Sequence, residues 1–200
     1  MKKILLLSAA SMIVAAATPA AAQSVTGTVN VTGNVQGRCS VVAAGGAAAQ
    51  TFTGTIGLGQ LDEDDGTLKA GLEGTSSAAS GGTPFATRVV CTAASVNVDV
   101  AAETLANGTR GTAPATGYAN EINYTAEMEV ALAAGTTDKV TFATASASNA
   151  GASKAVGRLA ASGNNVTVRA YGFATKGAST NLLVAGDYTS TITVNVSPSA

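Results

Sequence analysis

Polar and apolar residues alternate without a break from Ser24 to Gln36. Every odd position from Val25 to Val35 is valine or glycine, and every even position between them is threonine or asparagine. A period of two is typical of a β-strand with one apolar and one polar face. We therefore predict an uncharged strand over residues 25–35, whose apolar face carries Val25, Gly27, Val29, Val31, Gly33 and Val35.

Similar alternation predicts further strands along the whole chain. Near the C-terminus, Ile192, Val194 and Val196 fall on one face, and Ile122–Leu132 places a second apolar series on one face. The other predicted strands are Cys39–Val42, Thr51–Leu61, Ala86–Cys91, Ser95–Val100, Val140–Ala143 and Asn165–Phe173. Turn-rich Gly, Ser and Ala stretches separate them, and no helix is predicted after residue 22. Many short strands between turns predict an all-β sandwich or barrel.

The first 22 residues have the pattern of a secretory signal peptide. Lys2 and Lys3 precede an apolar run, and Ala20–Ala22 supplies small residues at the expected cleavage site. The apolar run is shorter than the ~20 residues that a membrane span needs, which favours a signal peptide over an anchor. We expect no membrane span in the mature chain. The predicted organisation is a signal peptide (1–22), an N-terminal strand with its linker (23–38) and one β-domain (39–200).

Two cysteines, Cys39 and Cys91, are present. An even number of cysteines in an exported protein predicts a disulfide. The bond would close a loop of about 50 residues, which the chain-entropy model values at roughly 4 kcal/mol.

The composition argues against an enzyme. The chain has no histidine and no tryptophan, which excludes a Ser-His-Asp or Cys-His site. Oxidised cysteines leave no thiolate nucleophile, and the sparse aromatic residues disfavour a sugar-binding cleft. Without Lys2 and Lys3, nine scattered basic residues face twelve acidic ones, so no nucleic-acid partner is expected. We predict neither a cofactor nor a metal.

One acidic cluster, Asp62–Asp65, interrupts this low-charge sequence. Several carboxylates on a turn are the ligands that Ca²⁺ prefers. The cluster lacks the ligand spacing of a calcium-binding loop, and we favour the interpretation that it is a solvated loop.

Three segments in order carry a family resemblance. The N-terminal alternating strand runs into Gly37-Arg-Cys-Ser-Val41, a second cysteine follows in Val89-Val-Cys-Thr92, and the chain closes with Ala185–Val196. This order resembles the chaperone–usher pilus subunits, in particular the archaic group related to spore coat protein U. Ile56–Leu61 and Ile122–Met128 are also similar to segments of that group. The resemblance implies an incomplete immunoglobulin-like β-sandwich that lacks its final strand and leaves a groove beside the C-terminal strand.

The same resemblance implies a structural subunit of a surface pilus or fimbria, active in adhesion or biofilm formation. A periplasmic chaperone would fill the groove first, and at an outer-membrane usher the N-terminal strand of the next copy would replace it. The apolar face of residues 25–35 would be the donor, and Ile192, Val194 and Val196 would line the acceptor groove. The expected partners are the chaperone, the usher and neighbouring copies in a head-to-tail homopolymer at the cell surface.

A second interpretation stays open. The chain could be a monomeric secreted or coat protein whose N-terminal strand fills its own groove. Only Gln36–Arg38 separates the strand from Cys39, which is short for an antiparallel return and favours exchange between chains.

Overall fold

The computed structural model describes residues 25–42, 46–74, 81–112, 114–146 and 151–199. The predicted signal peptide, residues 1–22, lies outside the described residues. The chain divides into two units, Met1–Asn34 and Val35–Ala200.

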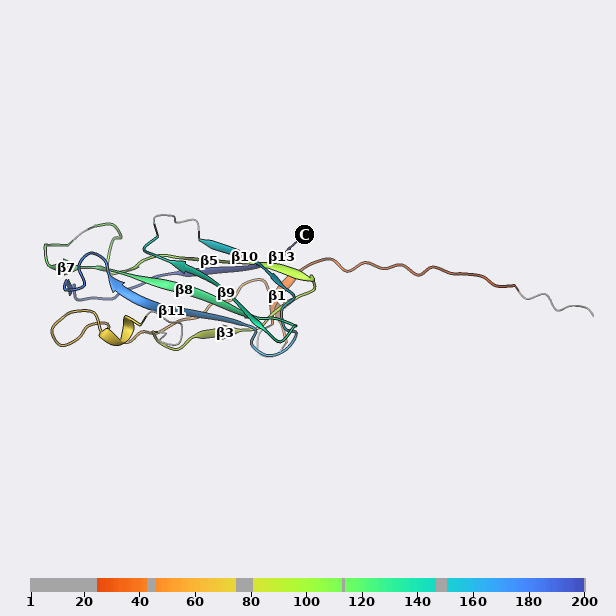
Figure 1. The fold of residues 1–200 in the computed structure, drawn as a ribbon, viewed down its shortest axis with the longest axis horizontal. Helices are drawn as coiled ribbons and strands as arrows, with labels where there is room; N and C mark the ends of the chain where they lie inside the picture. Colours follow the sequence, from red (N-terminus) through yellow and green to blue (C-terminus); the bar gives the residue numbers. More distant parts are fainter. Residues whose placement is uncertain (1–24, 43–45, 75–80, 113, 147–150, 200) are drawn as a thin grey trace, which may run out of the picture. The chain divides into compact units, whose positions relative to one another are not determined.

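The second unit consists mainly of β-strands (Figure 1). In chain order they are β1 (Cys39–Val42), β2 (Ala48–Ala49), β3 (Phe85–Thr87), β4 (Val89–Cys91), β5 (Ser95–Ala102), β6 (Leu105–Ala106), β7 (Tyr118–Ala119), β8 (Glu121–Ala131), β9 (Thr137–Ala143), β10 (Ala152–Gly157), β11 (Val166–Thr175), β12 (Leu182–Leu183) and β13 (Ile192–Pro198). Within the described residues the one helical element is the 3-10 turn η1 (Ala70–Leu72). The predicted all-β class is confirmed.

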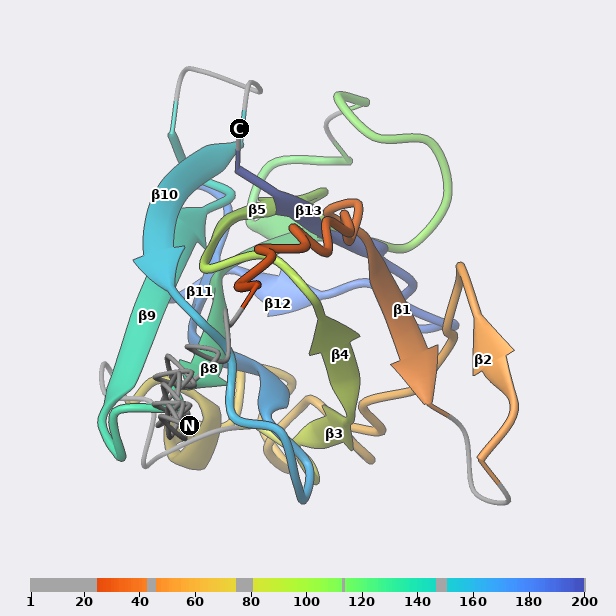
Figure 2. The same ribbon diagram turned by 90° about the vertical axis from the view of Figure 1, so that its right-hand side faces the viewer.

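The strands form three antiparallel sheets and one short parallel pair. The largest has the order β3-β11-β8-β6, with β9 also paired to β8, and the second has the order β10-β5-β13. The third is β2-β1-β4, and β12 runs parallel to β7. Figure 2 shows β10, β5 and β13 as neighbours, and β1 lies in contact with β13.

The sheets share one hydrophobic core, and β5 and β8 each bury an alternating series of side chains in it. Val96, Val98 and Val100 of β5 are at most 1% exposed, as every second residue of an alternating strand should be. On β8, the series predicted to share one face is buried from Ile122 to Val130. Each fully buried side chain of this size contributes roughly 1.5–3 kcal/mol, so these two strands anchor the fold.

The predicted disulfide is confirmed. Cys39 of β1 lies directly opposite Cys91 of β4 in the antiparallel register, with their Cα atoms 4.1 Å apart. The bond therefore links two neighbouring strands at the beginning of the β-domain.

The strand predicted over Thr51–Leu61 is wrong. Residues 51–61 form no strand, although Phe52, Ile56 and Leu58 pack against the core. Three glycines interrupt the segment, and one of them, Gly59, has a φ of +70° that a regular strand does not accommodate. The segment lies against the core as an irregular chain.

Residues 25–34 form the described part of the first unit and appear as an extended trace in Figure 1. They belong to no strand of the structure. Val25, Val29 and Val31 are 97%, 87% and 94% exposed. A strand is defined by hydrogen bonds to a neighbour, and the predicted strand has no such partner among the residues that the structure describes.

Candidate functional site

An open groove of about 1270 Å³ lies beside the last strand. One wall is the irregular segment 50–62, and the other is the segment 183–195, which includes most of β13. The described part of the chain contains no helix long and apolar enough to cross a bilayer. The groove lies open to solvent between these two walls.

The floor of the groove is formed by the core face of the largest sheet. Tyr124 of β8 and Phe173 of β11 stack there, with ring centroids 5.4 Å apart. Leu105, Val168 and Ala170 complete the floor. All five floor residues are at most 6% exposed, so the base is already close-packed and rigid.

The 50–62 wall is attached through aromatic packing. Phe52 stacks on Phe85 of β3, with ring centroids 5.6 Å apart and an interplanar angle of 12°. Gly54 lies so close to the Phe85 ring that any side chain at this position would overlap it. No backbone hydrogen bond joins residues 51–60 to another described residue, so packing positions this part of the wall. At its end, Leu61 accepts a hydrogen bond from Lys69 N at 2.8 Å, and Asp62 forms an antiparallel bridge with Leu68.

The opposite wall has an open backbone edge. Thr191 and Ser199, at the two ends of β13, hydrogen-bond toward the β5 side at 3.1 Å. Because alternate residues of an antiparallel strand face the same neighbour, the backbone groups of Ile192, Val194 and Val196 face away from β5. Within the described chain, β13 pairs with β5 only. The edge of β13 that faces away from β5 therefore has unpaired N–H and C=O groups at Ile192, Val194 and Val196.

Pro198 is the last residue of β13, and its backbone faces away from β5 like those of Ile192, Val194 and Val196. Proline has no N–H, and in sheets it is confined to edges whose N–H positions stay unpaired. Its position is consistent with an open edge and marks the point where a ladder along that edge would end.

Hydrogen bonds stabilise the part of the groove wall that precedes β13, at Tyr188 and Ser190. The hydroxyl groups of Tyr124 and Ser190 lie 2.7 Å apart, and Ser190 Oγ donates to the Glu103 carbonyl at 2.5 Å. The Tyr188 hydroxyl donates to the carbonyls of Ala119 and Val184 at 3.1 and 3.0 Å. Burial chiefly, and the negative charge of Asp62 to a smaller extent, raises the pKa of Tyr188. These hydroxyls are satisfied within the chain and stay protonated at neutral pH.

The segment that joins residues 25–35 to the β-domain is clamped by Thr92. Thr92 Oγ1 accepts a hydrogen bond from Arg38 N at 3.0 Å and donates to the Gln36 carbonyl at 2.8 Å. The Thr92 N–H also donates to the Arg38 carbonyl at 2.9 Å. Gly37 lies beside Pro198, where an added Cβ would be 3.4 Å from the proline ring. The linker is thus held next to the C-terminal end of β13.

The predicted groove residues fall on β13 as expected from the alternation. Ile192, Val194 and Val196 are half-buried and pack against the core, whereas Thr193 and Asn195 are exposed. Ile192 and Val194 line the groove, and Val196 lies further along the strand, opposite Val98 of β5. Of the predicted donor residues, Val35 is 77% exposed, and Gly27 and Gly33 have open space around their Cα atoms.

Sequence reasoning did not find most of the groove. Tyr124 lay on the apolar face of a predicted strand, which indicated burial but no groove. Phe173 has the parity of Thr167 and Arg169, and it reaches the core because the register of β11 shifts after Tyr171. The alternation in residues 51–61 predicted a strand and gave no sign of an irregular groove wall, and Phe85 was not singled out. Thr92 was part of a sequence motif, yet its side-chain role became visible only in the structure.

The acidic cluster makes local contacts. Asp65 Oδ1 accepts hydrogen bonds from the side chain and the backbone N–H of Thr67, which lower the pKa of Asp65. Glu63 Oε1 accepts from Ala70 N at 3.2 Å. Among the described residues, no group of three or more acidic, cysteine or histidine side chains is arranged to hold a metal ion.

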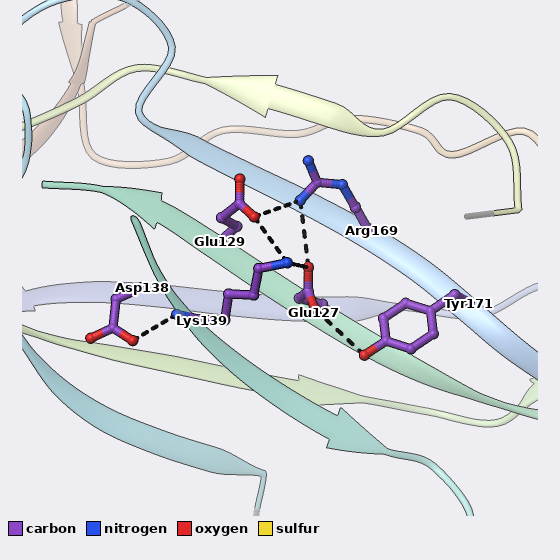
Figure 3. Close-up of polar contacts among 6 residues, drawn as sticks. All are labelled: Glu127, Glu129, Asp138, Lys139, Arg169 and Tyr171. Atoms are coloured by element: carbon purple, nitrogen blue, oxygen red, sulfur yellow. Dashed lines mark hydrogen bonds and ion pairs between the residues drawn. The ribbon is translucent and has the colours of Figure 1, made fainter. Parts of the chain in front are cut away.

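The outer face of the largest sheet carries a network of ion pairs (Figure 3). Glu127 of β8 is 3% exposed, and its carboxylate lies 3.0 Å from Lys139 Nζ and 3.5 Å from Arg169 Nη1. Glu129 lies 3.0 and 3.4 Å from the same two cations. Tyr171 donates to Glu127 Oε2 at 3.5 Å. The hydrogen bonds that Lys139 donates to Glu129 and Glu127 raise the pKa of Lys139. We refer to these five residues as the charged face.

A search of protein-family models, of characterised proteins and of solved structures finds no match to this chain.

Proposed function

We propose that this chain is the structural subunit of a surface filament of the chaperone–usher type, with an incomplete immunoglobulin-like fold. Residues 25–35 of one copy would occupy the groove of the next copy. They would add a strand to the open edge of β13, the recognition mode known as β-strand addition. A periplasmic chaperone and an outer-membrane usher are the partners that this assembly route requires.

One observation carries the proposal. The same chain has an apolar groove bordered by an unpaired strand edge and an alternating apolar segment that belongs to no strand. An exposed edge of this kind promotes aggregation unless something covers it. Each feature supplies what the other lacks, because the segment needs backbone partners and the groove needs apolar side chains.

The energetics favour such an insertion. Val25, Val29 and Val31 are almost fully exposed, and Val35 is mostly exposed. Burying the four valines would contribute about 6–10 kcal/mol of gross transfer free energy, at ~1.5–2.5 kcal/mol each. New backbone hydrogen bonds along β13 would open together or not at all, which would make dissociation slow.

The position of the linker supports contact between copies that does not close on itself. Each copy would give its N-terminal segment to one neighbour and receive a segment from another. A head-to-tail contact of this kind generates a filament unless the rotation between copies happens to close a ring.

The test is an SDS gel of material sheared from the surface of cells that express the full chain, with and without boiling. We expect a ladder in the unboiled sample that collapses on boiling to one band at the size of the monomer. Antiserum against the purified chain identifies the bands on a blot.

A single monomer band in both samples would contradict the proposal. It would favour the self-complemented monomer, in which residues 25–35 fill the groove of their own chain. A ladder that persists after boiling but disappears on reduction would also contradict it, because disulfides between chains would then explain the polymer.

A further inference from the structure

The two ends of the groove differ in charge. At the end near Tyr188, Asp62 and Asp187 both line the groove. Asp187 is exposed and Asp62 is half-buried. The loop that follows Asp62 is docked at this end, because Leu183 N donates to the Gly66 carbonyl at 2.8 Å. Three more exposed acids lie on that loop, and we call the whole set the acidic mouth: Asp62, Glu63, Asp64, Asp65 and Asp187.

The acidic mouth is left largely uncompensated. Lys69, at the end of the same loop, offsets only one of its five negative charges. Within the described residues, neither Asp62 nor Asp187 forms an ion pair with a basic side chain. A cation brought to this end of the groove would therefore meet an attractive potential.

The other end of β13 carries the opposite charge. Gly37 lies beside Pro198, and Arg38 follows it immediately. Arg38 is exposed, and its guanidinium forms no ion pair with any residue that the structure describes. Its backbone is fixed through both N–H and carbonyl to Thr92, so the cation projects from a defined point at the end of the linker.

We propose that Arg38 of an incoming copy pairs with Asp62 and Asp187 in the acidic mouth of its neighbour, which sets the direction in which residues 25–35 enter the groove. This inference rests on the proposed function. The inserted segment would run antiparallel to β13, with Val35 near Tyr188 and Val25 near Pro198. The opposite direction would place Arg38 at the Pro198 end and leave the acidic mouth without a partner.

The lengths of the two segments match, which allows full insertion in this direction. The wall from Asp187 to Pro198 has twelve residues, and the segment from Val25 to Val35 has eleven. At ~3.3 Å per residue the two extended segments span nearly the same distance. Directly opposite residues in a sheet point to the same face, so Val31 can lie beside Ile192, with both side chains toward the floor. Arg38, three positions beyond Val35, then reaches the mouth.

The first test is charge reversal in the full chain, with the rate at which SDS-resistant polymer appears after induction as the readout. Arg38→Glu should slow assembly about three- to tenfold at low ionic strength, because charges at the rim of an interface act mainly on association rates. Raising the salt concentration should shrink the difference, since exposed charges are screened within ~10 Å at 0.1 M. Arg158→Glu is the matched control, because Arg158 is also exposed but lies away from the groove.

A compensating charge reversal in the acidic mouth identifies the residues that pair with Arg38. Arg38→Glu combined with Asp187→Arg, or with Asp62→Arg and Asp187→Arg, should restore most of the rate. An unchanged rate for Arg38→Glu would overturn the inference, and so would a loss that neither combination relieves. Formation of the Cys39–Cys91 bond and the melting temperature check that each variant folds, and Asp187→Arg alone changes only one exposed side chain.

A second test reads the direction itself. Two copies are co-expressed, one with Gln36→Cys, which keeps Arg38, and the other with Ala185→Cys or Ser197→Cys, which keep Asp62 and Asp187. A crosslinked dimer with Ala185→Cys supports the antiparallel direction, whereas a dimer only with Ser197→Cys, or no crosslinked dimer with either variant, overturns it. Absence of any ladder from the unsubstituted chain would instead contradict the proposed function, so the two failures are distinguishable.

Discussion

Strands β8 and β11 present opposite surfaces on their two faces. On the outer face, Glu127 is buried beneath Lys139, Arg169 and Tyr171, and each charge has a partner within the chain. On the inner face, Tyr124 and Phe173 form the floor of a groove whose β13 wall has an unpaired backbone edge. The first surface has its charges paired within one molecule, whereas the second has a backbone edge without a partner among the described residues.

The difference shows how the two surfaces respond to partners. A network whose charges are already paired gains little from another molecule, because contact would remove water from groups that need no new hydrogen bonds. An apolar groove beside open backbone groups gains both buried area and hydrogen bonds. We therefore expect changes at the groove to alter assembly and changes at the charged face to alter stability alone.

The largest effect is expected from charge on the apolar face of residues 25–35. Val29→Asp with Val31→Asp should abolish the SDS-resistant ladder, because two carboxylates would have to enter an apolar groove. The folded β-domain should keep its melting temperature. The control is Asn30→Asp, which adds charge to the opposite face and should change assembly little. Equal losses from the two faces would contradict the donor assignment.

Removal of the disulfide should have the second largest effect, on stability. Cys39→Ser with Cys91→Ser releases a bond between neighbouring strands and should cost about 2–5 kcal/mol of unfolding free energy. Urea denaturation of both proteins measures the difference. If the loss remained below ~1 kcal/mol, the bond would contribute little to holding β1 on β4.

The charged face should show a smaller effect that leaves assembly intact. Glu127→Gln removes the charge that Lys139 and Arg169 share and should destabilise the domain by about 1–2 kcal/mol. Glu129→Gln is the matched control and should cost less, because Glu129 is 23% exposed and Glu127 only 3%. Loss of the SDS-resistant ladder in a folded Glu127→Gln protein would contradict the expectation that the charged face affects stability alone.

The smallest effect should appear on acidification. Glu121 lies on the same face of β8; burial opposes its ionisation, but hydrogen bonds from Lys176 and from Gly111 N outweigh burial and lower the pKa. A lowered folded-state pKa means that the stabilisation is present above the unfolded pKa of about 4.3 and is lost as the pH falls through the folded value. Denaturation at pH 7 and at decreasing pH should show a weaker acid dependence for Glu121→Gln. An identical dependence in both proteins would contradict this assignment.

Local alternation predicted the regular strands well and the irregular parts poorly. The buried series on β8 and the half-buried series on β13 fall on the predicted faces, because successive side chains of any strand point to opposite sides. Strand β10 (Ala152–Gly157) was not predicted. Its residues are mostly exposed, so it carries almost no apolar signal, and its pairing with β5 comes from backbone hydrogen bonds.

The groove depends on contacts between segments far apart in sequence. The 50–62 wall is positioned by the packing of Phe52 and Gly54 on Phe85, and no local pattern encodes such packing. The alternation near Thr51–Leu61 suggested a strand because its apolar residues do face the core. Its glycines instead let the chain follow the surface of the sheet without a ladder.

The sequence by itself determined the all-β class, the cysteine pair and the apolar faces of β8 and β13. These follow from the two-residue period of extended backbone and from oxidation chemistry, which are properties of short segments. The tertiary structure alone decided that β13 keeps one edge unpaired, that an irregular segment forms the facing wall and that the acidic loop lies at one end of the groove. Those features depend on which distant segments pack together, and a side chain's local pattern carries no information about its distant neighbours.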